Sequence, residues 1–177
     1  MDWLEGEDSV LWGDLKELYR FLRALSRMVV SEEWLWKKKV FILGSYKREC
    51  LERLERLKEE INRLGDVYAF LMSDVPDFLR NLVDKFASLA LLADAIILVV
   101  EHDIGGHVLE CGIIISKKEF FHKSLILVRK GVSLSLMFKE GALKPPYFKE
   151  GKNLFYFETE NDIVNIAKNW LNRFFKK

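Results

Sequence analysis

Short apolar runs alternate with longer amphipathic segments along the chain from residue 40 onward. Five of these runs are expected to form strands, at residues 40–45, 67–72, 95–100, 124–129 and 154–158. Strands that alternate with helices are typical of a mainly parallel sheet covered by helices on both faces. We therefore predict an α/β fold, with a doubly wound, flavodoxin-like or Rossmann-like sheet of five strands in the order 2-1-3-4-5.

Two of the helical segments have clear boundaries in the sequence. The first helix has apolar residues at every third or fourth position: Leu51, Leu54, Leu57, Ile61 and Leu64. Gly65 should end this helix, and Glu49 and Arg53 are spaced to form an i,i+4 ion pair on its outer side. The last helix carries one apolar stripe: Ile163, Ile166, Ala167, Trp170, Leu171 and Phe174. Thr159 or Asn161 is available as its N-cap.

Residues 1–38 precede this pattern and are predicted to be a helical extension to a Rossmann-like domain of residues 39–177. The extension has an apolar stripe at helical spacing: Leu15, Leu18, Leu22, Leu25 and Val29. It also contains the large apolar side chains of Trp3, Trp12, Trp34 and Trp36, which need cover from the domain or from a partner. Two interpretations follow, a helix folded back on its own domain and an arm that forms a homodimer. Lys37 to Lys39 are expected to form a solvated lead-in to the first strand.

The charge balance argues against several classes of partner. There are 28 Lys and Arg against 27 Asp and Glu, so the chain lacks the basic field that sequence-independent nucleic-acid binding requires. No apolar run is long enough to span a bilayer, and the first residues do not resemble a signal peptide. We therefore expect a cytoplasmic protein with neither a nucleic-acid nor a membrane partner.

The composition bears on redox chemistry and on the source. Cys50 and Cys111 fall within expected helices without CxxC spacing, so they are expected to be buried thiols and not a disulfide or a zinc site. We expect no metal and no cofactor. The chain lacks Gln and has a single Thr, a depletion that favours a thermophilic source.

Ligands of a parallel sheet collect beyond the carboxyl ends of its strands, so the loops there are the first candidates for a site. After the first strand, Gly44 can let a ligand approach the backbone and Ser45 can donate a hydrogen bond. Lys47 or Arg48 would then balance a phosphate or carboxylate, with Tyr46 shaping the pocket. A turn with no ligand is the alternative, because the segment matches neither a dinucleotide-binding nor a Walker motif.

The second strand leads into an acidic loop with Asp74 and Asp77. Asp74 can contact a sugar hydroxyl or a base edge, and its alternative is a cap or Asx-turn. Asp77, directly after Pro76, is better explained by the dipole of the next helix.

The third loop follows the apolar run that ends at Val100. Gly105 and Gly106 allow a tight turn, and a helix from about His107 would place Glu110 in or near its first turn. The helix dipole would help this carboxylate to stay ionised. An ionised carboxylate can stabilise or attack the positive anomeric carbon that develops when an N-glycosidic bond breaks. His107 can reach the same space or serve as an exposed capping residue.

The strand that ends in Gly44-Ser45, the pair Ala93-Asp94, the glycines 105–106 and the Glu110 segment resemble the nucleoside 2-deoxyribosyltransferase-like superfamily. That superfamily includes deoxynucleoside monophosphate N-glycosidases. The resemblance covers residues 39–130 and implies a nucleoside or nucleotide substrate across the strand ends, Glu110 as nucleophile and an oligomeric assembly. The TIR-like Rossmannoid domains, which cleave the nicotinamide glycosidic bond of NAD, are a more distant resemblance.

Phe86 departs from the superfamily pattern, because it stands where those enzymes carry an acidic residue that helps the leaving base. Asp84 and Ser88 are the nearest polar residues, but two helical positions rotate a side chain by ~200°. Three functions therefore remain open: an N-glycosidase or deoxyribosyltransferase, a nucleotide-binding module without catalysis, and a protein-interaction domain based on the N-terminal helix.

Overall fold

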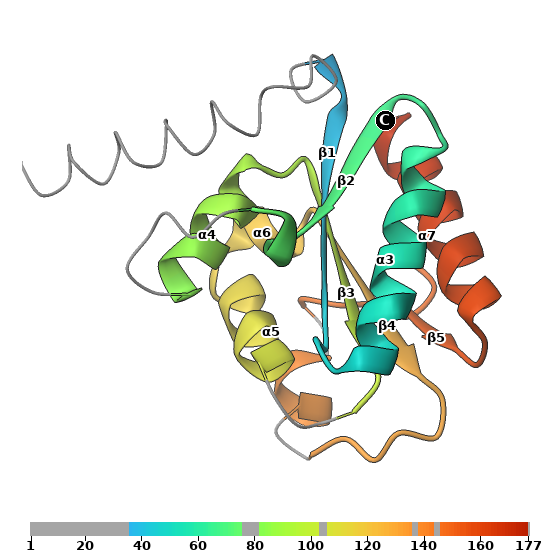
Figure 1. The fold of residues 1–177 in the computed structure, drawn as a ribbon. Coiled ribbons are helices and arrows are strands. Elements are labelled where there is room, and N and C mark those ends of the chain that lie inside the picture. The colour runs from blue at the N-terminus through green and yellow to red at the C-terminus, as the bar shows by residue number, and fades with distance from the viewer. Residues whose placement is uncertain (1–35, 76–81, 103–105, 136–137, 144–145, 177) are drawn as a thin grey trace, which may run out of the picture.

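The computed structural model describes residues 36–75, 82–102, 106–135, 138–143 and 146–176. Within these ranges the five expected strands are present: β1 (Lys38–Gly44), β2 (Val67–Leu71), β3 (Ala95–Val100), β4 (Ser124–Arg129) and β5 (Leu154–Phe157). They form one parallel sheet in the order β2-β1-β3-β4-β5. The predicted flavodoxin-like fold and strand order are therefore confirmed (Figure 1).

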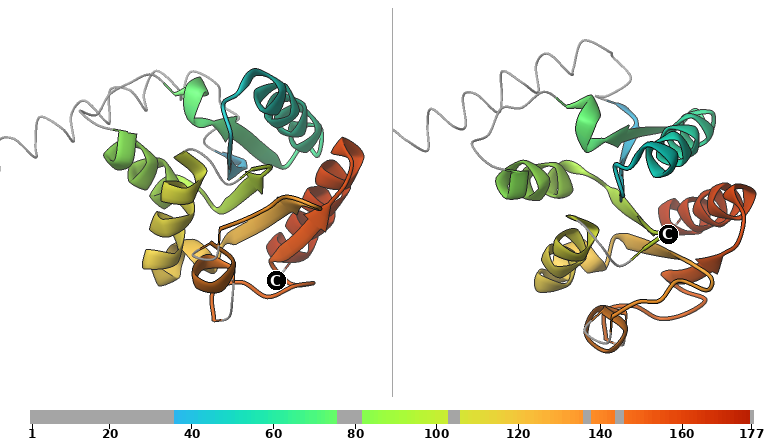
Figure 2. Two further views of the ribbon diagram at one scale, coloured as in Figure 1. Left: turned by 90° about the horizontal axis from the view of Figure 1, so that it is seen from below. Right: turned by 60° about the horizontal axis from the view of Figure 1, so that its bottom comes forward.

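Helices cover both faces of the sheet. On one face lie α3 (Arg48–Asn62) and α7 (Glu160–Phe175). The other face is covered by α4 (Leu82–Leu92), α5 (Gly106–Ser116), α6 (Lys118–Phe121) and the π-helical turn η2 (Phe138–Ala142). The two layers are separate in the views of Figure 2. A short 3₁₀ turn, η1 (Met72–Asp74), follows β2.

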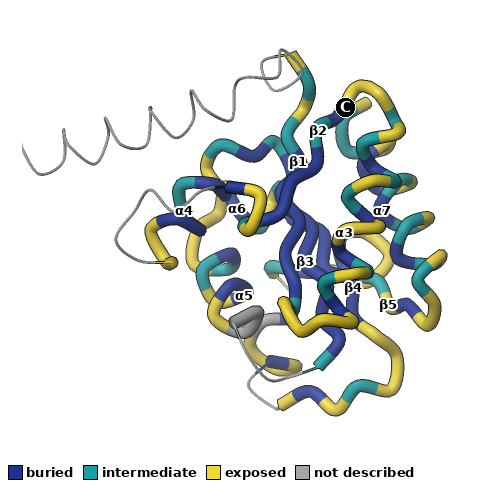
Figure 3. Tube along the Cα trace, in the orientation of Figure 1, coloured by how far each residue is buried: buried dark blue, intermediate teal, exposed yellow. Residues whose placement is uncertain are grey.

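Every residue of the central strand β3 is buried, as a strand covered on both faces requires (Figure 3). Its side chains alternate between the two cores, so that Ile96, Leu98 and Val100 face α4 and α5. Ile97 and Val99 face α3 and α7. Cys50 and Cys111 are buried and free, in agreement with the interpretation of both as apolar side chains.

The ends of the helices follow the sequence signals. Gly65 lies just beyond α3 with φ of 86°, a conformation that glycine adopts without strain. Thr159 caps α7, because its hydroxyl accepts the Asp162 amide at 3.2 Å and Asp162 accepts the Thr159 amide at 2.8 Å. Asn161 instead accepts a hydrogen bond from Arg56.

The expected lead-in of three lysines is partly wrong, because β1 already begins at Lys38. The Lys39 amide donates to the Asp94 carboxylate at 2.8 Å, and the Asp94 amide donates to the Lys39 carbonyl at 2.8 Å. The Ala93-Asp94 pair thus anchors β3 to β1 at the amino ends of the strands, opposite to the candidate site. Trp36 is 86% exposed. The predicted helix at 15–29 and the other three tryptophans of the extension lie outside the described residues.

Candidate functional site at the carboxyl ends of the strands

The crevice expected for a ligand lies between β1 and β3. These strands are neighbours, but the helices that follow them, α3 and α5, pack on opposite faces of the sheet. In open α/β sheets this topological switch opens a crevice beyond the strand ends. A hydrogen bond joins the two loops there, with Ser45 Oγ and His102 Nε2 2.9 Å apart. Ser45 is thus at the crevice as expected, whereas His102 is a site residue that was not predicted from the sequence.

Gly44 is still part of β1 and is buried. A Cβ atom at this position would lie 3.0 Å from the Val99 carbonyl oxygen and 3.1 Å from a Leu54 methyl group. The space beside Gly44 is therefore occupied by α3 and β3, and the glycine admits the helix and not a ligand. The sequence interpretation of Gly44 as a point of ligand approach is corrected accordingly.

Gly44→Ala should lower the free energy of unfolding by about 1–3 kcal/mol, because a backbone oxygen cannot easily move away from the new methyl group. Gly112→Ala is the matched control, since Gly112 lies within α5 with open space around it. That substitution should be neutral or stabilise by up to about 1 kcal/mol. Urea denaturation measures both variants. If both substitutions changed the free energy of unfolding equally, the close approach of Val99 and Leu54 would not exclude a side chain at position 44.

A second carboxylate that the sequence analysis missed stands at the end of β3. The Glu101 side chain is 3% exposed and pairs with Arg53 of α3, with Nη2 and Oε1 2.7 Å apart. Arg129, at the end of β4, lies 3.9 Å from the same oxygen. The i,i+4 pair of Arg53 with Glu49 is therefore a wrong prediction, because Arg53 reaches across to the sheet instead.

These groups border an open cavity of about 430 Å³ at the strand ends. Its lining is mostly polar: Lys47, Arg48, Glu49, Cys50, Arg53, Glu101, His102 and Arg129. Burial and the neighbouring Glu101 raise the pKa of the Cys50 thiol, so this cysteine stays protonated. The cationic residues outnumber the acidic ones, which suits an anionic group of a ligand.

Glu110 lies on α5, where only 7% of the residue is exposed. Its Oε2 atom is buried and has no hydrogen-bond partner among the described residues. Burial raises the pKa of Glu110 to about 7. The sequence predicts an ionised carboxylate at the helix start. The helix begins at Gly106, so Glu110 lies beyond its first turn and burial outweighs the dipole.

Tyr46 lies within electrostatic range of Glu110. Its hydroxyl accepts the Met72 amide at 3.1 Å, which fixes the ring between the ends of β1 and β2. Burial, and then the charge of Glu110, raise the pKa of Tyr46 to about 12. The phenol therefore keeps its proton at neutral pH and can donate a hydrogen bond to a ligand.

The raised pKa of Glu110 makes protein stability depend on pH. The folded protein holds this proton more tightly than the unfolded chain, so the free energy of unfolding falls as pH rises from 4.5 to about 7. Glu110→Gln removes the effect. Between pH 4 and pH 8 the free energy of unfolding of this variant should rise by roughly 3 kcal/mol relative to that of the wild type. Urea denaturation at pH 4 and pH 8 measures this gain. Glu119→Gln, on the exposed side of α6, is the control and should show no gain. A gain near zero for Glu110→Gln would contradict the burial of the Glu110 carboxylate.

Asp74 adopts the cap arrangement that was the alternative to ligand binding. Its carboxylate accepts the Leu71 amide at 2.8 Å and pairs with Lys58 of α3 at 3.0 Å. Both oxygens are engaged within the protein. Asp77 lies outside the described residues.

The glycine turn before α5 is described only in part. Gly106 is the first residue of α5, whereas Gly105 and the His107 side chain lie outside what the structure describes. Phe86 is 2% exposed and packs against Phe41, with ring centroids 5.8 Å apart. Asp84 is exposed. The helix before β3 thus directs an aromatic ring into the core at the register where the resemblance expects an acid.

These features define an α/β protein of the flavodoxin-like class with polar side chains gathered at the carboxyl ends of its central strands. The chain belongs to DUF8170, a family of unknown function, whose profile matches residues 6–139. The matched range includes most of the extension 1–38 as well as Tyr46, Glu101 and Glu110. No curated protein matches the chain.

Among solved structures, the chain is similar to the metal-soaked Flv1 flavodiiron core from Synechocystis sp. PCC6803, with a TM-score of 0.52 and 10% identity. The similarity covers 89% of this chain and 40% of that chain, so this protein spans less than half of that structure's length. At this identity the similarity shows the fold alone. In the described part of the chain, no three His, Cys, Asp or Glu side chains are grouped to hold a metal, and no helix is long and apolar enough to cross a bilayer.

Proposed function

We propose that the protein binds a nucleoside or nucleotide in the crevice between β1 and β3 and acts on its N-glycosidic bond through Glu110. The observation that carries the proposal is the buried Glu110 carboxylate, whose Oε2 has no hydrogen-bond partner among the described residues. Leaving such a group unpaired costs stability. Unpaired polar groups of this kind are typical of sites that meet a ligand.

The chemistry follows from the charge that develops as the bond breaks. When the C–N bond cleaves, its electron pair leaves with the base, and the anomeric carbon becomes positive. The ionised Glu110 attacks this carbon and forms a glycosyl ester, which water or a second base then resolves. With a pKa of about 7, a large fraction of Glu110 is ionised at neutral pH. Tyr46, which stays protonated, can donate a hydrogen bond to the ligand.

The polar cavity at the strand ends supports a nucleotide as the ligand. Lys47, Arg48 and Arg129 line it at the start of α3 and the end of β4. Cationic side chains and the amino end of a helix both favour a phosphate group. The resemblance to the nucleoside 2-deoxyribosyltransferase-like superfamily agrees with this substrate class, and the TIR-like resemblance adds NAD to the candidates.

The burial of Phe86 favours a second function, nucleotide binding without turnover. Its ring lies in the core, so α4 offers no acid to the leaving base at that position. The leaving base would then have to take its proton from water or be stable without one.

One experiment separates the two functions. The protein is incubated with deoxynucleotides, ribonucleotides, nucleosides and NAD, base release is followed by chromatography, and melting temperatures are recorded in parallel. Base release that requires Glu110 supports the first function. Melting shifts with no release support the second. Neither shift nor release would contradict both.

A further inference from the structure

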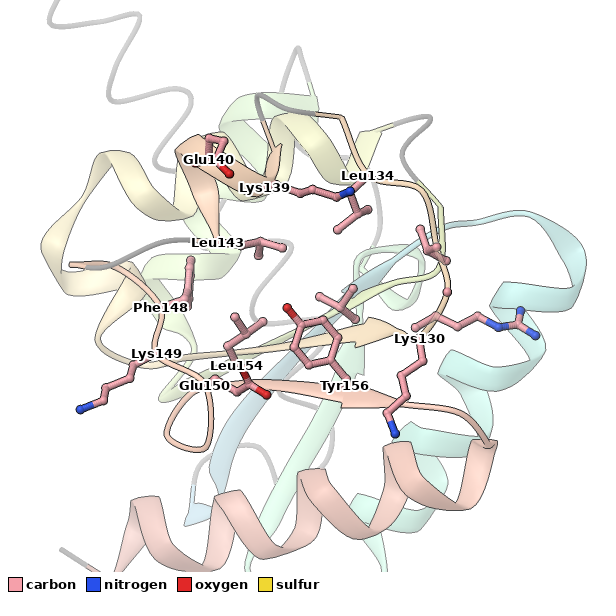
Figure 4. A pocket seen from close by; sticks show the side chains of 14 residues that line it. Lys130, Leu134, Lys139, Glu140, Leu143, Phe148, Lys149, Glu150, Leu154 and Tyr156 are labelled. Atoms are coloured by element: carbon pink, nitrogen blue, oxygen red, sulfur yellow. The ribbon is translucent and has the colours of Figure 1, made fainter.

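A separate cavity of about 600 Å³ lies over the edge strand β5 (Figure 4). It is bordered by the connection from β4 to β5, of which residues 130–135, 138–143 and 146–153 are described. The crossovers through α4 and α5 use helices of 11 residues each, whereas the described part of this connection forms only the five-residue turn η2. Tyr156, which points to the same face as the buried Leu154, is left 40% exposed.

The cavity has an apolar interior. Leu134, Leu143, Phe148 and Leu154 line it, and each is less than 10% exposed. Figure 4 shows the Tyr156 hydroxyl directed into the space that these side chains surround. Its size and its apolar walls with a single directed hydroxyl are those of small-molecule sites.

The rim of the cavity carries charges of both signs, with Arg129, Lys130, Lys139 and Lys149 against Glu140 and Glu150. Arg129 pairs with Glu101 at 3.9 Å. Lys130 is paired with Glu158 at 2.7 Å and is directed away from the cavity (Figure 4). Lys139 instead extends along the rim toward Leu134, where its ammonium group overlooks the apolar interior.

We infer that this cavity is a second ligand site, which takes a small amphipathic anion: a carboxylate with an aliphatic or aromatic body. The body occupies the apolar interior, the Tyr156 hydroxyl donates a hydrogen bond, and Lys139 pairs with the carboxylate. Charge-assisted hydrogen bonds of this type give both affinity and orientation. The site involves neither Glu110 nor Tyr46, so it stands whether or not the protein acts on an N-glycosidic bond.

Octanoate, octanol and octylammonium test the inference, because they share an alkyl body and differ in charge. We expect the full-length protein to melt at a higher temperature with octanoate, to shift less with octanol and not to shift with octylammonium. An absent octanoate shift, or an equal shift with octylammonium, would overturn the inference.

Two variants locate the binding. Lys139→Met keeps the alkyl stem and should raise the octanoate dissociation constant about tenfold without changing that of octanol. Leu143→Trp should fill the cavity and abolish the binding of both octanoate and octanol. Lys118→Met, on the exposed part of α6, is the matched control and should change neither dissociation constant. If Leu143→Trp does not fold, Lys139→Met decides alone: octanoate affinity that is unchanged in that variant places the binding elsewhere and rejects the site.

Discussion

Glu110→Gln should lower the rate of base release by at least about 10³-fold, because the amide cannot form a glycosyl ester and nucleophile replacements usually cost this much or more. The amide has nearly the shape of the carboxylic acid, so nucleotide affinity should change much less than the rate. The variant should also be more stable than the wild type above pH 7, since the buried charge is gone. A lost rate therefore cannot be ascribed to unfolding.

A second replacement, at Tyr46, distinguishes the contribution of the Glu110 carboxylate to the rate from that of its polar surroundings. Tyr46→Phe removes the hydroxyl that the charge of Glu110 influences, but keeps the ring and the carboxylate. It should lower the rate less than Glu110→Gln does, since a polar neighbour contributes less than the nucleophile. Rates are measured by chromatography under saturating nucleotide. A Glu110→Gln variant that releases base as fast as the wild type would remove Glu110 from the reaction.

Arg53→Ala should destabilise the protein by about 3–5 kcal/mol, the cost of leaving a buried charge without its partner. Glu101 is 3% exposed, and its remaining cation, Arg129, is more distant at 3.9 Å and half exposed. Replacing both Arg53 and Glu101 by Met should recover at least half of the loss, because the buried charge is then gone as well.

Arg48→Ala is the control for this cycle. Arg48 also pairs with a glutamate, Glu52, but its side chain is 93% exposed, so its removal should have no measurable effect. Urea denaturation of the three variants and the wild type gives the free energies of unfolding. If Arg53→Ala behaves like Arg48→Ala, the pair at the strand ends is not a structural element of the site.

The fold was predictable because its signals are local. Apolar runs such as Ile96–Val100 identify buried strands, and the spacing of Leu54, Leu57 and Ile61 assigns a helix and its buried face. The strand order follows from the known preferences of alternating strands and helices. Gly65 and Thr159 mark helix ends by backbone and side-chain chemistry that any fold would use.

The site was predictable only in outline. Ser45 and Glu110 could be placed at strand ends from their positions in the chain, but their partners depend on tertiary packing. Ser45 meets His102 across 57 residues of sequence, and Arg53 turns inward to Glu101 when helical spacing favoured Glu49. The helix dipole suggested an ionised Glu110, whereas the neighbouring elements bury it and raise its pKa to about 7. Burial of this kind is set by elements far apart in the chain.

The most direct measurement is base release with the protein in molar excess over each nucleotide. If Glu110 acts on the N-glycosidic bond, the wild type should convert at least one nucleotide to free base, and Glu110→Gln should leave the same nucleotide intact over the same time. Equal release by both proteins, or no release by the wild type from any nucleotide or NAD, would contradict the proposed reaction.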